Sequence, residues 1–417
     1  MLQIDHIYEF FKKSIFKNAF CVWVPLGGIT PVNKNLKVND FMIFNDLHGL
    51  HKILFIDQEP LIPQVSFDYV ECFSYPGPEI TIEEIFLDYL DKQPYGVGPF
   101  NFDIYQKFQN FPQMVLKEPR VLVTSEKSEI VYELSKKYKL KTLYYFFHGF
   151  AALDWYRGLY ALNYNKPVFR LYKHDYITFN RIVSVDRSYR CYFVSKLVEK
   201  NLLNHGQISF GLDKNSPDWK AELIDAHSKL SSDARKFCFQ QLSSIETPLT
   251  IDGENITGSA SSDIAKNVDD SFWHVVTETV FYYDKLHLTE KIFKPIVSKQ
   301  PFMLLAAPGN LAYLKSYGFK TFDSVIDESY DNIQDHEQRT DAVVDQLNWY
   351  CNLNHREKLD ITRKLEPIIE HNFHHFYGEF RHIITRELLG NCQTLFKEIG
   401  YDDGDIAYDD IYRVLTA

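Results

Sequence analysis

Residues 271–308 constrain the fold of this chain more than any other stretch, because they combine the patterns of a strand, a loop, a helix and a second strand. Residues 272–276 and 302–306 are apolar runs of strand length. Between them, Thr289 is a suitable N-cap, and apolar residues follow at helical spacing, at Ile292, Phe293, Ile296 and Val297. This order predicts two parallel strands joined by a helix, which is the repeating unit of α/β folds.

Three ionisable residues occupy the turns of this unit, namely Glu278, Glu290 and Lys291. In an open parallel sheet, ligands bind outside the carboxyl ends of the strands. A helix N-terminus at that edge offers free N–H groups and a positive dipole end, which suit a phosphate. We therefore expect Lys291 to bind a phosphate and the two glutamates to bind ribose hydroxyls. The alternative is an ordinary unit in which these side chains only solvate the start of a helix.

The composition indicates a globular enzyme of two α/β domains. The chain has 417 residues, which exceeds the size of one ordinary core, and it is 45% hydrophobic and 24% charged. The formal net charge of −11 argues against a surface that generally coats nucleic acid, although a local basic groove stays open. No apolar run reaches the roughly 20 residues that span a bilayer, and the N-terminus lacks the apolar core of a signal peptide.

The cysteines favour a cytoplasmic protein with reduced thiols. The six cysteines are scattered without CxxC spacing, so their spacing predicts neither a disulfide framework nor a zinc site. The acidic residues of 319–332 also lack the spacing of a calcium loop, and we expect a strand followed by a solvated loop there. The sequence therefore predicts no metal site.

Strand and helix patterns alternate through residues 1–165, which predicts a first Rossmann-like domain. One predicted strand, residues 52–56, runs directly into Asp57 and Glu59. A carboxylate at the carboxyl end of a strand, partly desolvated in a cleft, can act as a general base. A polar loop ended by Pro60 is the alternative explanation for these two residues.

Residues 147–165 carry further polar candidates beside the first domain. His148 follows a predicted strand directly, and Asp154 and Arg157 lie in the segment after it. We assign these three residues to the acceptor side of a cleft, although a lone histidine is more often structural.

Residues 166–360 predict a second Rossmann-like domain, and residues 361–417 a helical segment that packs back on the first domain. A strand is expected at 168–173. The next predicted strand ends at Asn180, and Arg187 and Arg190 follow in the first turns of an amphipathic helix. Arginine near a helix start can bind a diphosphate through its planar guanidinium group.

The order of these elements resembles the GT-B glycosyltransferases, and most closely the bacterial α1,3-fucosyltransferase type. The sequence VTET at 276–279 followed by LTEKIF at 288–293 resembles the Phe-Glu-Asn … Val-Thr-Glu-Lys donor motif of that family. Arg190 with the residues around it resembles its Ser-Asn … Arg … Tyr … Leu element. ILFIDQEP at 53–60 followed by FDY at 67–69 resembles its Gly-Glu-Asn turn and later Phe-Asp-Tyr. The chain also looks like uncharacterised glycosyltransferase-like proteins of tailed phages and marine bacteria.

The resemblance implies two Rossmann-like, doubly wound domains that face a cleft, and a role for each matched residue. Glu59 would be the general base, with Asp57 as its rival. Arg190 and Lys291 would bind the donor diphosphate, and Glu290 the ribose or sugar. Thr279 and Gln58 stand where the family has Asn and Gly, which leaves the donor sugar open.

The resemblance, together with these patterns, implies an inverting glycosyltransferase. It would transfer a sugar from a nucleotide-diphosphate sugar to a glycan or to a hydroxymethylated DNA base, without a metal or other cofactor. Its donor-binding residues would be Arg190, Arg187, Asn180, Glu278, Glu290 and Lys291. A glycoside hydrolase that uses Glu278 and Glu290, and a non-catalytic glycan-binding protein, are the alternatives.

Overall fold

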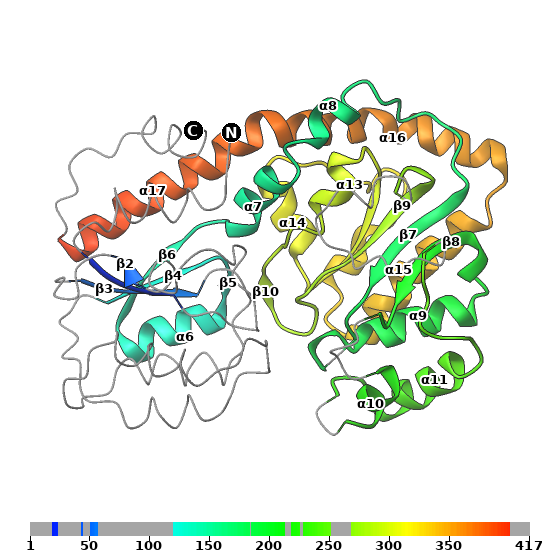
Figure 1. Ribbon diagram of the computed structural model, residues 1–417, viewed down its shortest axis with the longest axis horizontal. Helices are drawn as coiled ribbons and strands as arrows, with labels where there is room; N and C mark the ends of the chain where they lie inside the picture. The colour runs from blue at the N-terminus through cyan, green and yellow to red at the C-terminus, as the bar shows by residue number, and fades with distance from the viewer. Residues whose placement is uncertain are drawn as a thin grey trace. The chain divides into compact units, whose positions relative to one another are not determined.

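The computed structural model describes two compact units, each with its own sheet (Figure 1). One unit is Met1–Phe150 with Ile384–Ala417, and the other is Ala151–Ile383. The described residues are 19–23, 43–44, 51–56, 120–183, 185–212, 218–225, 228–251 and 268–400.

The first unit contains a five-stranded sheet in the order β2-β1-β3-β4-β6. Four of its strands are parallel, and β2 pairs with β1 in the antiparallel direction. Their bounds are β1 Ala19–Trp23, β2 Ile43–Phe44, β3 His51–Ile56, β4 Arg120–Thr124 and β6 Leu140–Tyr144. Strand β3 contains the strand predicted at residues 52–56.

Helix α6 (Glu129–Tyr138) joins β4 to β6, after the short strand β5 (Lys127–Ser128). Its start is fixed by Ser128, whose hydroxyl accepts a hydrogen bond from the amide of Val131. The C-terminal part of helix α17 (Arg381–Ile399) also belongs to this unit. There Asn391 donates to the carbonyl of Tyr144 at the end of β6.

The second unit contains four parallel strands in the order β11-β9-β7-β8. The strands are β7 His174–Asn180, β8 Gly206–Phe210, β9 Ser271–Thr277 and β11 Phe302–Leu305. Counted along the chain, the first strand lies between the second and the third, which is a doubly wound order. The strand order reverses between β7 and β9. In such sheets, this reversal is where ligands bind.

Helices cover both faces of this sheet (Figure 1). On one face α9 packs against α15, and on the other α13 packs against α8 and α16. Their bounds are α8 Leu159–Asn163, α9 Tyr189–Glu199, α13 Phe293–Val297, α15 His336–Cys351 and α16 His355–His375. The remaining elements of the unit include α10 Trp219–Ile224, α11 Ser232–Leu242, α14 Asn310–Ser316 and β10 Lys285–Leu286. Helix α7, Phe147–Trp155, begins in the first unit and ends in the second.

Two predicted strands of the second unit are not formed. Residues 168–173 remain irregular, because Phe169 and Leu171 are exposed and find no neighbouring strand to cover them. In residues 319–332, the Glu328 carboxylate accepts the amide proton of Phe322 and the hydroxyl proton of Thr321. A side chain therefore takes a donor that a sheet would have used, and the segment ends in a 3-10 turn at Glu328–Asn332.

The carboxylates of residues 319–332 bind backbone and lysine rather than gathering at one point. Asp331 is buried and accepts from the amides of Leu311 and Ala312 at the start of α14. Glu328 also pairs with Lys315. The prediction of a solvated loop is therefore wrong for Asp331 and Glu328, whose carboxylates hold the loop in place.

The fold is α/β with parallel sheets and C-terminal helices, as the sequence predicted. The predicted domain bounds, 1–165, 166–360 and 361–417, differ from those of the compact units. Residues 151–165 lie in the second unit, and the C-terminal segment is divided between the two.

Candidate functional site

The candidate site lies at the carboxyl ends of β7 and β9, where the strand order reverses. Asn180 is the last residue of β7, and Glu278 directly follows the last residue of β9, Thr277. The order of the strands therefore brings residues from two distant segments of the chain to one edge.

Arg190 joins these two strand ends. Its guanidinium group donates to the carbonyl oxygen of Ile182, 2.8 Å away, and to that of Thr277, also 2.8 Å away. It also contacts the carbonyl of Glu278 at 3.4 Å, and the residue is only 4% exposed. Arg190 therefore donates these hydrogen bonds to backbone carbonyls, and the prediction that it binds a diphosphate directly stays a prediction.

Tyr189 adds a second connection beside Arg190. Its hydroxyl donates to the carbonyl of Glu278 at 2.5 Å, and its ring stacks on Phe281 with the centroids 3.9 Å apart. Because Tyr189 and Arg190 are the first two residues of α9, they attach the start of this helix to the end of β9.

Glu278 lies inside the protein and joins two loops. Its carboxylate accepts from the amide of Thr289 at 3.2 Å, from the hydroxyl of Thr289 at 2.5 Å and from the amide of Thr279 at 3.3 Å. Burial raises the pKa of the Glu278 carboxyl, while the charge of Lys291 and the bonds from Thr289 oppose that shift. The side chain is fully buried, so its present role is to hold the loop at Thr289 against the end of β9.

Lys291 is a partly exposed cation at this edge. Its ammonium group lies 3.2 Å from the hydroxyls of Thr279 and Thr289, and 3.1 Å from the Glu290 carboxylate. Its side chain is 30% exposed. Glu290 is held through its carbonyl, which accepts from the hydroxyl of Tyr156. The structure therefore brings Glu278, Glu290 and Lys291 together, as the sequence suggested.

The helix after these residues is shorter than predicted. It has five residues and begins at Phe293 rather than at Glu290. Thr289 still accepts from the amide of Lys291, at 3.4 Å, but this bond closes a turn instead of capping a long helix. The predicted helix start at Glu290 is therefore wrong, and the binding of a phosphate beside Lys291 stays a prediction. The predicted buried face, Ile292, Phe293, Ile296 and Val297, is confirmed.

Two further cations at this edge, Lys294 and Arg181, were not predicted as binding residues. Lys294 is buried and lies near Glu290, Lys291 and Arg181. Burial lowers the pKa of Lys294 to about 8, and Glu290 partly opposes the shift. Lys294 stands three residues after Lys291, and Arg181 directly follows Asn180. The sequence contained that signal, because residues three apart share a helix face and residues at strand ends reach the ligand edge.

Asn180 and Arg187 lie near this group. Asn180 is fully buried and donates to the hydroxyl of Thr178 at 3.1 Å, and its side-chain oxygen has no hydrogen-bond partner among the described residues. Arg187 ends a 3-10 turn, is half-buried, and its charge acts on Tyr189. Both are therefore neighbours of the β7 end, as expected.

The predicted acceptor-side residues belong to two different units. His148 is buried on α7 in the first unit, and Asp154 and Arg157 belong to the second. Arg157 is paired with Asp154, and its side chain is 46% exposed. The predicted general bases, Asp57 and Glu59, lie outside the described residues.

Comparisons of the chain with protein-family models, with curated proteins and with solved structures give no match. In the described part of the chain, no helix is both long and apolar enough to cross a membrane.

Proposed function

We propose that the chain is an inverting glycosyltransferase that takes a sugar from a nucleotide-diphosphate sugar. The observation that carries this proposal is the group of Lys291, Lys294 and Arg181 at the reversal of strand order between β7 and β9. Three cations beside the carboxyl ends of parallel strands suit a diphosphate, which is the anion that leaves when the sugar is transferred.

In this proposal the residues divide into those that contact the diphosphate and those that position them. Lys291 is accessible and Lys294 adds charge from a desolvated position, so both stabilise negative charge that develops on the leaving group. Arg190 and Glu278 hold the surrounding backbone, since their bonds connect the end of β9 to α9 and to Thr289. Glu290 lies beside Lys291 and is the candidate for a ribose or sugar hydroxyl.

The general base of the reaction is proposed to be Glu59, with Asp57 as its rival, on sequence grounds alone: both follow the strand at residues 52–56, and Glu59 matches the base of the family that the chain resembles. The two-domain GT-B arrangement and the likeness to fucosyltransferases have the same basis. A glycan acceptor is favoured over a modified DNA base, because a chain of net charge −11 is poorly suited to a polyanion. The proposed reaction needs no metal ion, because the three cations can neutralise the diphosphate.

A glycoside hydrolase built on Glu278 and Glu290 is not favoured. Such an enzyme needs both carboxyls to face the sugar. Glu278 is fully buried and bonded to Thr279 and Thr289, so its carboxylate is not presented to a ligand.

Binding of UDP, GDP, dTDP and CMP, followed by thermal shift and calorimetry, tests the donor site. We expect one of the diphosphates to stabilise the protein, and Lys291→Met to weaken its binding by roughly 30-fold, as for a lost charge-assisted bond of about 2 kcal/mol. Lys236→Met, on the exposed face of α11, is the matched control and should bind normally. Failure of every nucleotide to bind would exclude the transferase.

Turnover distinguishes an enzyme from a binding protein. Glu59→Gln should bind the nucleotide with unchanged affinity and lose release of the nucleotide diphosphate from the sugar donor. Asp57→Asn is compared with it in the same assay. If Glu59→Gln keeps full turnover and Asp57→Asn loses it, the base is Asp57. If both keep it, the assignment of a carboxylate base at this turn is wrong.

A further inference from the structure

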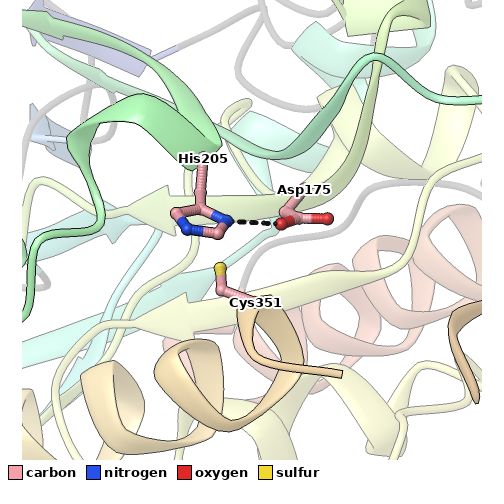
Figure 2. Close-up of side chains that lie close together, drawn as sticks. All are labelled: Asp175, His205 and Cys351. Carbon is pink, nitrogen blue, oxygen red and sulfur yellow. Dashed lines mark hydrogen bonds and ion pairs between the residues drawn. The ribbon is translucent and has the colours of Figure 1, made fainter. Parts of the chain in front are cut away.

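A second cluster of side chains lies at the opposite edge of the same sheet, at the amino ends of its strands (Figure 2). Asp175 is the second residue of β7, His205 directly precedes β8, and Cys351 is the last residue of α15. Asp175 and Asn180 are five strand residues apart, which corresponds to about 17 Å. The cluster is therefore separate from the candidate donor site.

The three side chains converge on one point. A ring nitrogen of His205, the sulfur of Cys351 and a carboxylate oxygen of Asp175 all lie within 4.8 Å of one another. The closest pair is Nδ1 of His205 and Oδ2 of Asp175, at 2.8 Å. Zinc binds nitrogen and oxygen at about 2.0–2.2 Å and sulfur at about 2.3 Å, so ligand atoms around it lie roughly 3.2–3.8 Å apart. Small side-chain shifts would bring these atoms to such distances.

A lysine orients the carboxylate from its other side. The ammonium group of Lys358 lies 2.7 Å from Oδ1 of Asp175 and 3.2 Å from the carbonyl of Cys351. It therefore binds the oxygen that faces away from His205 and leaves Oδ2 directed at the imidazole. Outer-shell partners of this kind fix the direction of ligating carboxylates in metal sites.

The backbone beside His205 is fixed by close packing. Gly206 lies against the ring of Tyr176, and a Cβ atom at this glycine would stand only 2.3 Å from that ring. The Tyr176 hydroxyl in turn donates to the carbonyl of Leu202. His205 is therefore held in position before any ligand arrives, which lowers the ordering cost of binding.

Exposure differs among the three residues in a way that suits an ion. Cys351 is 4% exposed, whereas the His205 side chain is 39% exposed. The partly exposed His205 side chain leaves an entry path for the ion, and a water molecule would supply the fourth ligand. The combination of thiolate, imidazole and carboxylate is typical of zinc and cobalt sites, whereas magnesium and calcium prefer oxygen ligands alone.

We propose that Asp175, His205 and Cys351 bind a divalent transition-metal ion of the zinc type, which joins β7 and β8 to the end of α15. This ion would be structural and would have no part in the proposed sugar transfer. It goes beyond the proposed function and does not depend on it.

Binding to this site exchanges a proton for the ion. The Cys351 thiol loses its proton to solvent as the sulfur–metal bond forms, and the neutral imidazole contributes a lone pair, so no electron is transferred. In the metal-free protein, burial raises the pKa of the Cys351 thiol to about 12, and the nearby Asp175 adds to the shift. The ion therefore competes with a tightly held proton, and its affinity increases with pH.

Sequence spacing gave no sign of this cluster, because its members are separated by many residues. The sequence predicts no zinc site, because it contains no CxxC spacing. The other explanation of the cluster is a metal-free network, in which the His205 imidazole and Lys358 both donate to Asp175.

A cobalt titration of the full chain, after removal of metal with a chelator, distinguishes the two explanations. A cobalt-bound thiolate gives an intense near-ultraviolet charge-transfer absorption that nitrogen and oxygen ligands do not give. We expect this absorption to saturate at one cobalt per chain, and Cys351→Ser to abolish it. Cys238→Ser is the matched control, because Cys238 is also a buried cysteine but lies on α11.

His205→Ala provides a second variant in case Cys351→Ser does not fold, since the His205 side chain is partly exposed. It should weaken zinc binding, measured by calorimetry, by about 100-fold or more, as expected for loss of a direct ligand when outer-shell partners alone contribute 10–100-fold. Zinc should also raise the Tm of the wild-type chain and not that of His205→Ala. Absence of the charge-transfer absorption, or its persistence in Cys351→Ser, would overturn the proposal, as would equal zinc affinity in His205→Ala.

Discussion

The two edges of the four-stranded sheet carry different kinds of side chain. At the carboxyl edge, Arg190 and Lys294 are buried cations, and Arg190 bonds to backbone carbonyls. At the amino edge, the Asp175 carboxylate and the Cys351 thiol lie beside the His205 imidazole. Parallel strands place all their starts on one side and all their ends on the other, so each edge gathers segments that are distant in the chain. This contrast is the basis of our two proposals, an anion site at one edge and a metal site at the other.

Removal of the guanidinium group of Arg190 should have the largest effect. Arg190→Met leaves the carbonyls of Ile182 and Thr277 without their donor, and each unpaired buried group costs about 1–3 kcal/mol. We expect a loss of about 3 kcal/mol in the free energy of unfolding, measured with urea, and loss of nucleotide binding.

Arg363→Met is the control for this substitution, because Arg363 is exposed on α16 and pairs only with Asp360. It should change stability by less than about 0.5 kcal/mol. Equal stability of the Arg190 and Arg363 variants would show that the carboxyl edge does not depend on this arginine.

His274 lies midway along β9, between the two edges, and should make the protein sensitive to acid. Burial, with a further contribution from the Lys294 charge, lowers the pKa of His274 to about 3. The unfolded chain therefore binds a proton at about pH 6.5 that the folded chain does not bind until about pH 3. The contribution of His274 to the free energy of unfolding is therefore fully present above about pH 6.5. It is lost as the pH falls from about 6.5 to about 3, by up to about 1.4 kcal/mol per pH unit.

The measurement compares urea unfolding of the wild type and His274→Gln at pH 6.5 and 4.5. Carboxylates that titrate in this range act in both proteins, so the difference between them reports His274. We expect the wild type to lose about 2–3 kcal/mol more than the variant over these two units. Parallel pH profiles would contradict the lowered pKa.

Lys294 should give nucleotide binding a pH dependence. Its pKa of about 8 means that the charged form, which attracts a diphosphate, is lost as the pH rises through that value. From pH 7 to 9.5 we expect the affinity for the nucleotide diphosphate that binds in the thermal-shift test to fall about tenfold, in line with a charge-assisted bond of at least about 1.5 kcal/mol.

Lys294→Arg should retain its affinity across this range, because arginine stays charged. Lys294→Met should bind weakly at every pH. Calorimetry of all three proteins in one buffer series tests the assignment, and an equally steep fall in Lys294→Met would assign the dependence to another group.

The smallest of these effects concerns the lysine that orients Asp175 at the amino edge. Lys358→Met removes its contact with the carboxylate, and outer-shell changes of this kind reduce metal affinity by about tenfold or more. Zinc calorimetry should show about a tenfold loss, while nucleotide binding stays unchanged. Tighter zinc binding in Lys358→Met would mean that the lysine charge competes with the ion.

Local patterns in the sequence were sufficient for much of the second sheet. The strands β9 and β11 were predicted because each contains a short, mainly apolar run, interrupted in β9 by His274, and both are buried along their whole length. The grouping of Glu290 with Lys291 was also predictable, since they are neighbours in one turn.

Contacts made through the backbone could not be predicted in this way. Arg190 donates to the carbonyl oxygens of Ile182 and Thr277. Because every residue has a carbonyl, the sequence does not indicate which ones Arg190 binds. The cluster around Cys351 was also hidden, because only the path of the chain brings its members together. The strand predicted at 168–173 is not formed, because an apolar pattern alone does not supply a neighbouring strand to pair with.

The carbonyl oxygens that bind Arg190 have no net charge, so they leave its positive charge uncompensated. Among the described residues, no carboxylate forms an ion pair with Arg190, and the residue is buried, where salt screens a charge weakly. In the proposed transferase, this fixed local charge would attract the diphosphate of an approaching nucleotide, against the net negative charge of the chain. On that proposal, the rate at which the nucleotide arrives, and not only its affinity, depends on how one helix is attached to the end of one strand.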